Sequence, residues 1–481
     1  MYIHIMIVII ALATIALWFG AGYKDAQKVE DRYSLSAILL ASWIIADGLF
    51  GVHFFVLRAA GIFDITIERL FFAMIIFSLA VGLLKGTVRF ETNITIEIAM
   101  GIFSLVCLIS MIRYGFTAVT PDFISPWFAF ISGYLFPFLI FIFSKNFIVR
   151  EKDVMLIFHV LFYFGLYLSI VALLEFTNLR QFIFPQYIND PTIGIHIDRA
   201  RGTFLNAAFN GVGILIGFIC GVHLLQKKTG FAQVFYQLAL LAFFPAVFFT
   251  LTRSVYVGLV ITLFIFLGWY KTSFSKWKLI ALPLVIVMMI GIANSPRLFS
   301  KERREGGVLQ KEEVDIRFAL LRRSYFFFAK HPIAGIGLAQ FTPSSIRSYT
   351  GRVSFIEEEA PATLQHNHLL GVATELGIPG LLSYLAMLFL ILWRLKLVAG
   401  KLPATGIIGN NLPIVIFAVW GVYLNNNLFT EPSSNIFINA IPFLFAGLAD
   451  GLYTRYLETG LLSPSPIRVS PSSLRIIKNH V

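Results

Sequence analysis

Two histidines stand out in the segment QHNHLL at 365–370. Histidine is the side chain whose ordinary pKa best suits proton transfer at neutral pH, so His366 or His368 could act as a general base. Asn367 separates them, and residues two apart do not share a helix face, which argues against a metal pair. The alternative is that each is only a polar residue at the start of an apolar helix.

Arginines supply a second kind of chemistry. Arg199 and Arg201 lie in IDRARGTF, and Arg253 lies in LTRS between two apolar runs. A guanidinium group is a planar donor fork that suits phosphate oxygens, so a cluster of them predicts an anion site. The alternative is that each arginine snorkels to the lipid headgroups.

Carboxylates and amides inside apolar surroundings form a third group. Glu375 lies about two and a half turns beyond His366, where a carboxylate needs a partner or a functional role. Glu175 raises the same question. A polar edge also follows a late apolar run, and interhelical hydrogen bonding is the alternative to a site role there. Its members are Asn425, Asn426, Asn427 and Glu431.

The elements that must position these residues are apolar. The chain is 58% hydrophobic and only 13% charged, against about 25% charged residues in soluble domains. Runs long enough to cross a bilayer predict an all-α polytopic membrane protein with 12–14 spanning helices, because a backbone in lipid must satisfy its own hydrogen bonds. The thirteen runs are 2–19, 34–57, 66–84, 96–112, 125–144, 153–175, 203–225, 233–251, 254–270, 277–293, 369–393, 411–429 and 434–454.

The net charge of +12 is spread over many short connections, so it does not indicate nucleic-acid binding. Both cysteines, Cys107 and Cys220, lie in apolar runs, and we expect neither a disulfide nor a metal site.

Lysine and arginine counts in the short connections predict the orientation. One alternating set of connections carries twenty of these residues and the other carries seven. Positive residues favour the cytoplasmic side. This rule predicts a multi-pass protein of the cytoplasmic membrane with a cytoplasmic C-terminus, and it places the loop 295–368 on the outer side.

That loop interrupts a single transmembrane domain, 1–458, and we expect it to carry helices of its own. Apolar residues at helical spacing predict an amphipathic helix over 312–330, with an apolar face that includes Phe318, Leu321 and Tyr325. Arg317 lies on its polar face. The Ser/Pro-rich tail at 459–481 is predicted to be disordered.

Four segments, taken in order, resemble the superfamily of O-antigen ligases and O-antigen polymerases. They are RARGTFLN at 199–206, LTRSVYVGL at 251–259, the segment FALLRRSYFFFAKHPIAGIGLAQF after Arg317, and HNHLLGVATELGIPG at 366–380. Many members carry Asn-Pro-Asn after Gly-Thr-Phe, where this chain has Asn206-Ala207-Ala208, so Asn206 is given less weight than the other matched positions.

The resemblance implies the C-type fold of membrane glycosyltransferases. It implies a donor glycan on a polyisoprenyl (undecaprenyl) diphosphate, an acceptor hydroxyl on lipid A-core or another glycan, and no metal, nucleotide sugar or other cofactor. By position, His366 matches the family's essential histidine, and Arg199 and Arg253 match its diphosphate-facing arginines. Arg317 matches the arginine that opens the loop helix, and Glu375 matches the family's helix carboxylate. Arg201 lies at a position that varies in the family, so we rank it below Arg199 as a substrate-binding candidate. Asn367, His368, Glu375 and Glu431 are expected to support the site.

We therefore expect a ligase that acts on the outer face of the membrane with inversion of the anomeric centre. A repeat-unit polymerase of the same superfamily is the first alternative, because the motifs are shared. A flippase for lipid-linked glycans is an alternative of another class, since it too would have many spans and cationic residues. A scaffold without chemistry is the third.

Overall fold

The structure is a computed structural model that describes residues 33–271, 311–347, 365–431 and 435–459, with short gaps at 52, 60–62, 87, 89–92, 119–122 and 149 and a few residues between 285 and 295. The predicted span at 2–19 and the tail beyond 459 lie outside the described residues. So do most of the span predicted at 277–293 and parts of the loop 295–368.

Among the described residues between 33 and 206, the regular secondary structure is helical apart from one small hairpin. The helices are α2 (Leu35–Leu49), α3 (Ile67–Leu84), α4 (Thr95–Tyr114), α5 (Pro126–Phe130), the π-helix η2 (Ile131–Leu135), α6 (Phe136–Phe147), α7 (Glu151–Phe176) and the short 3₁₀ turns η3 (Arg180–Phe182), η4 (Gln186–Asn189) and η5 (Gly202–Phe204). Strands β1 (Leu57–Ala59) and β2 (Phe63–Ile65) pair antiparallel, with Leu57 opposite Ile65.

The second half contains α8 (Ala207–Leu225), α9 (Gly230–Phe249), α10 (Arg253–Trp269), α13 (Lys311–Lys330), α14 (Phe341–Arg347), α16 (His368–Ala399), α17 (Leu412–Asn427) and α18 (Ile436–Thr459). Within the described part of the chain, eight helical segments are long and apolar enough to cross a membrane, and α2 and α10 are shorter apolar helices. The predicted all-α multi-pass membrane fold is confirmed. The total of 12–14 spans stays a prediction.

One boundary was predicted wrongly. The apolar run 34–57 contains a helix that ends at Leu49, after which the chain turns into the β1–β2 hairpin. Apolar composition alone does not separate a helix from the strand that follows it, and the local break signals are Gly48 and Gly51.

Helix α8 is the centre of the bundle, and every residue of it is buried. Gly217 on α8 faces Gly165 on α7, and a Cβ added to Gly217 would lie 2.6 Å from the Gly165 Cα atom. Lipid tails are as apolar as the side chains, so the hydrophobic effect does not hold helices together inside a membrane. Small residues let two helix backbones approach closely, and van der Waals contact between them stabilises the pair. This contact fixes the core against which the outer helices pack.

Helix α16 is kinked at Gly377, whose φ of 68° is left-handed. The segment after α13 fills the kink, because Ile336 N donates to Thr374 O over 3.1 Å and Ile378 N donates to Pro332 O over 2.8 Å. A Cβ on Gly377 would lie 2.4 Å from Ile333 O. Glycine is therefore required for the loop to dock onto the helix.

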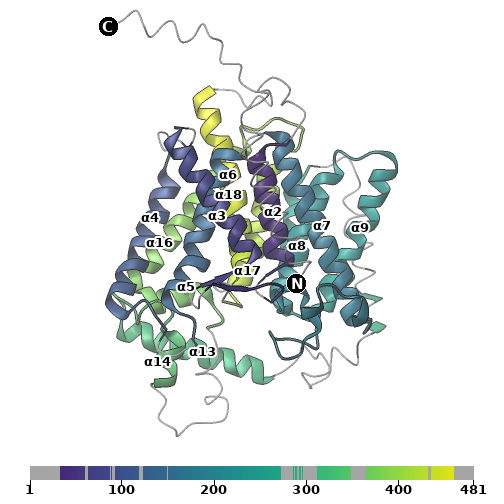
Figure 1. Cartoon of the computed structure of the whole chain (residues 1–481). Coiled ribbons are helices and arrows are strands. Elements are labelled where there is room, and N and C mark those ends of the chain that lie inside the picture. Colours follow the sequence, from purple (N-terminus) through teal and green to yellow (C-terminus); the bar gives the residue numbers. More distant parts are fainter. Residues whose placement is uncertain are drawn as a thin grey trace, which may run out of the picture.

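Helices α13 and α14 lie across one end of the bundle, below α4, α5 and α16 in the view of Figure 1. We call this the α13 end. The segments that join α7 to α8, α9 to α10 and α17 to α18 reach the same end, because successive spans run in alternate directions. The end where α7 and α17 begin is called the opposite end.

Candidate functional site at the α13 end

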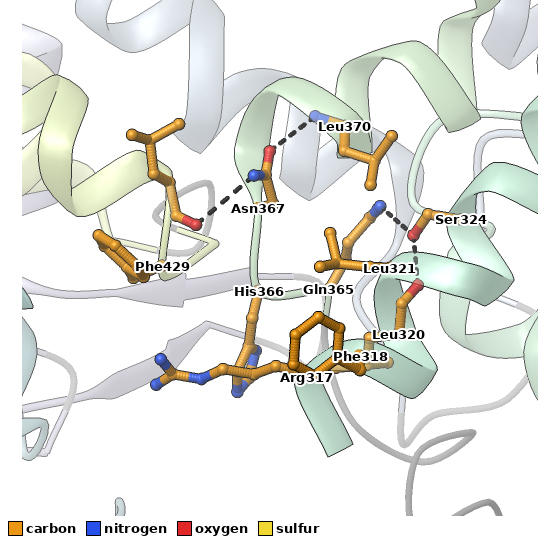
Figure 2. A pocket seen from close by; sticks show the side chains of 11 residues that line it. Arg317, Phe318, Leu320, Leu321, Ser324, Gln365, His366, Asn367, Leu370 and Phe429 are labelled. Atoms are coloured by element: carbon orange, nitrogen blue, oxygen red, sulfur yellow. Dashed lines mark hydrogen bonds between the residues drawn. The ribbon is translucent and has the colours of Figure 1, made fainter. Parts of the chain in front are cut away.

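A cavity of about 230 Å³ opens between α13, the segment that leads into α16 and the chain after α17. Figure 2 shows its wall, in which Arg317 and the imidazole of His366 lie on the same side. The lining residues are Arg317, Phe318, Leu320, Leu321, Ser324, Gln365, His366, Asn367, Leu370, Leu428 and Phe429. The structure thus brings together two residues that lie 49 positions apart in the sequence.

Helix α13 forms at the predicted place, but its buried side differs from the predicted apolar face. Leu320, Ser324 and Phe327 are buried, whereas Phe318 and Tyr325 are 62% and 70% exposed. An apolar side chain beside a membrane needs no protein partner, so hydrophobic spacing does not distinguish the packed side from the open side. As a result, Phe318 faces the cavity rather than the core.

The position of His366 is set by the helix start that follows it. Asn367 is the N-cap of α16, and its Oδ1 accepts from Leu370 N over 2.9 Å. Its Nδ2 donates to Leu428 O over 3.5 Å, which ties the helix start to the end of α17. An N-cap residue has extended backbone, so the residue before it leaves the helix axis. His366 therefore lines the cavity instead of joining the helix.

His368 has a different environment from His366. It is buried, and its Nδ1 lies 2.9 Å from Glu431 Oε1. The rings of Tyr134 and Tyr384 pack around it, with centroids 5.9 and 5.3 Å away. Tyr134 comes from the π-helix η2, a widened turn inside the span formed by α5 and α6. His368 and Glu431 therefore form a packed pair beneath the loop, not a wall of the cavity.

Glu375 finds its partners in the loop that fills the kink. Its Oε2 accepts from Ala339 N over 2.9 Å and its Oε1 accepts from Phe341 N over 3.0 Å. Phe341 begins α14, so the carboxylate caps that helix from another element. Both oxygens hold backbone, which gives Glu375 a positioning role in the described geometry.

Arg253 is exposed at the first position of α10, and it makes no ion pair with any residue that the structure describes. The next residue is anchored, because Asn425 Nδ2 donates to Ser254 O over 2.7 Å. Asn425 belongs to the last turn of α17, directly before the chain that contacts Asn367. Arg253 and His366 therefore lie at the same end of the bundle.

Arg199 and Arg201 lie in the turn before α8 and have different surroundings. Arg199 is mostly buried, with its Nε 3.8 Å from Asp198 Oδ2. Arg201 is fully buried and donates to the carbonyl oxygens of Ile188, Ile193 and Asp190.

The Arg201 guanidinium therefore holds the outer turns that precede α8. Burial lowers the pKa of Arg201, and the nearby Glu175 carboxylate acts in the opposite direction. Arginine still carries its charge at neutral pH. Glu175 itself accepts from Gly202 N over 3.1 Å, so this carboxylate at the end of an apolar helix has a backbone partner.

The cavity thus joins three of the predicted site residues, namely Arg317, His366 and Asn367, and leaves the others around it. Gln365, Ser324 and Phe429 line it without having been predicted. Gln365 precedes the histidine motif directly, which is the one signal that the sequence offered. Among the described residues, no three His, Cys, Asp or Glu side chains gather as a metal site requires.

Residues 238–385 match the family model described as O-antigen ligase. The match confirms the resemblance that the motifs predicted, and it supports a glycosyltransferase of the O-antigen ligase and polymerase type. No curated protein matches the chain.

The matched segment runs from within α9 to beyond the kink in α16. It contains Arg253, Arg317, His366, His368 and Glu375. Arg199, Arg201 and Glu431 lie outside it, so their assignment rests on the motifs and on their place in the fold.

Proposed function

We propose that the protein transfers a glycan from a polyisoprenyl diphosphate carrier to an acceptor hydroxyl at the outer face of the cytoplasmic membrane, as an O-antigen ligase does. The observation that carries the proposal is that Arg317 and His366 line the same cavity. Both residues lie in the segment that matches the O-antigen ligase family. A cation beside a histidine suits a reaction that releases an anion and removes a proton.

In the proposed step the acceptor oxygen attacks the anomeric carbon of the donor sugar. The bond from that carbon to the diphosphate oxygen breaks, and the electron pair leaves with the lipid diphosphate. The acceptor proton passes to His366, and the anomeric configuration is inverted. Guanidinium groups stabilise the charge on the leaving group, an effect worth about 3 kcal/mol for a well-placed donor in a water-poor site.

The arginines divide this work by position. Arg317 lines the cavity and is assigned to the leaving diphosphate near the reacting carbon. Arg253 and Arg199 lie at the same end of the bundle and are assigned to the diphosphate as it approaches from the lipid side. Arg201, which donates to three carbonyl oxygens, is assigned to positioning the turn that carries Arg199.

The test uses purified protein in liposomes with a polyprenyl-diphosphate glycan and candidate acceptors, without metal or nucleotide. We expect glycan transfer by the wild type and its loss in His366→Ala. Transfer that survives unchanged in His366→Ala overturns the assignment of the base. Donor movement across the bilayer without transfer to any acceptor supports a flippase instead.

The same assay separates a ligase from a polymerase. A ligase passes the glycan to a different acceptor, whereas a polymerase extends the glycan on a second copy of the donor. Products of increasing repeat number with donor alone, and no transfer to a lipid or glycan acceptor, would identify the polymerase.

A further inference from the structure

A side-chain bond joins two walls of the cavity. The segment that leads into α16 supplies His366, and the chain after α17 supplies Phe429. His368 lies two residues after His366, and Glu431 lies two residues after Phe429. His368 Nδ1 is 2.9 Å from Glu431 Oε1. The bond therefore connects the two segments directly behind the residues that line the cavity.

The direction of this bond follows from its acceptor. A carboxylate only accepts hydrogen bonds, so His368 Nδ1 donates to Glu431. A hydrogen bond to an ionised group is roughly twice as strong as one between neutral groups. A second bond between the same walls, from Asn367 Nδ2 to Leu428 O in Figure 2, is 3.5 Å long. Of the two, the bond between His368 and Glu431 is the shorter and is charge-assisted.

Both partners of the bond are fixed in place. The His368 side chain is 3% exposed, and the rings of Tyr134 and Tyr384 lie against it with centroids 5.9 and 5.3 Å away. A Cβ added to Gly371 would lie 3.2 Å from Glu431 Oε2, so glycine lets the carboxylate lie close to the first turn of α16. A negative charge is favoured at that end of a helix.

The backbone carries this fixed position to the cavity. Asn426 O accepts from Phe429 N and from Thr430 N, each over 2.9 Å, and from Thr430 Oγ1 over 2.9 Å. This tight turn leads directly to Glu431, so the position of Glu431 also sets that of Phe429. On the other wall, the N-cap of α16 fixes the direction in which His366 leaves the helix.

We propose that His368 and Glu431 form a positioning pair, which holds His366 at a fixed place relative to the wall that follows α17. Neither member lines the cavity, so the pair acts through His366. A general base must lie within hydrogen-bond reach of the proton it removes. The inference rests on the proposed function and deepens it, because it names the residues that align the base.

The experiment measures kcat and KM for glycan transfer in liposomes, below the melting temperature of every variant. His368→Leu and Glu431→Ala each remove the bond. We expect each to lower kcat by about tenfold to hundredfold, because a misplacement of about 1 Å has an effect of that size. The KM for the donor should stay near that of the wild type, because the arginines assigned to the diphosphate are unchanged.

Conservative variants separate the bond from the packing around it. His368→Asn places an amide N–H group near the position of Nδ1, and Glu431→Gln keeps an acceptor oxygen. We expect both to retain most of the wild-type kcat, although His368→Asn should melt at a lower temperature because it loses the ring. The double variant His368→Leu/Glu431→Ala should be no slower than the slower single variant, since both remove one bond.

Lys145→Met is the matched control for lost stability. Lys145 Nζ lies 2.8 Å from Asp450 Oδ2 in a buried ion pair at the opposite end of the bundle, so this variant should melt earlier with a wild-type kcat. Glu431 is partly exposed, so Glu431→Ala carries the test if His368→Leu does not fold.

Three results overturn the positioning pair while the wild type continues to transfer glycan. The first is a wild-type kcat in Glu431→Ala. The second is a loss in His368→Asn as large as that in His368→Leu. The third is a double variant whose loss is the product of the two single losses. Absence of all transfer by the wild type overturns the proposed function, and the inference with it.

Discussion

The two ends of the helix bundle arrange their charged side chains in different ways. At the opposite end, Lys145 pairs with Glu97 and with Asp450, which lies 2.8 Å away, and Arg394 lies 3.0 Å from the other oxygen of Asp450. Two cations meet two carboxylates there. At the α13 end, Arg317 lines a cavity and Arg253 makes no ion pair with any described residue.

This difference separates charges that join helices from charges that can bind a ligand. Lys145, Asp450 and Arg394 come from α6, α18 and α16, so their ion pairs fasten three helices to one another. A neutralised cluster has no charge left for a ligand. Arg253, which is exposed and makes no ion pair with a described residue, retains the capacity to bind an anion. The predictions below test this division, from the largest expected effect to the smallest.

Loss of the cavity histidine should have the largest effect. We expect His366→Ala to lower the rate of glycan transfer by about 10²–10⁴-fold, the usual contribution of a general base. Its melting temperature in detergent should stay close to that of the wild type. His159→Ala, in the half of α7 that lies toward the opposite end, is the control and should transfer normally. Equal losses in both variants would contradict a specific role for His366.

Loss of the buried lysine should affect stability instead. In Lys145→Met, Glu97 loses the lysine with which it pairs, whereas Asp450 keeps its contact with Arg394. A broken buried pair costs about 3–5 kcal/mol. We expect a clearly lower melting temperature, with normal transfer by the protein that remains folded. Lys396→Met, an exposed lysine of α16, serves as the control. An unchanged melting temperature would show that the cluster does not fasten the helices.

Arg253→Lys keeps the charge at the α13 end and removes the planar fork. We expect transfer to fall by about 10²-fold, which corresponds to roughly 3 kcal/mol for one lost donor arrangement. Arg322→Lys, on an exposed side of α13, should retain activity. Full activity in Arg253→Lys, measured with the same donor, would rule out bidentate phosphate binding at this position.

The smallest effect is expected for Glu375→Gln. One of the two backbone donors, Ala339 N or Phe341 N, then loses its acceptor, at a cost of about 1–2 kcal/mol. We expect a modest decrease in melting temperature and a rate within about tenfold of the wild type. A rate loss of the size seen for His366→Ala, at unchanged melting temperature, would place Glu375 in the chemistry.

The sequence by itself determined the membrane class, most of the long helices that the structure describes, the loop helix predicted at 312–330 and the family to which the motifs point. These features depend on local composition and spacing, because a span must be apolar over its whole length and a motif lies in one segment. The same information identified His366 and Arg317 as separate candidates.

Only the tertiary structure decided which candidates meet. It placed His366 in the cavity and its neighbour His368 against Glu431, since one lies before the N-cap of α16 and the other lies after it. It also joined Gln365 to Ser324, 41 residues away, through a hydrogen bond. Contacts between distant segments follow from how helices pack, and the pattern along a single helix does not encode them.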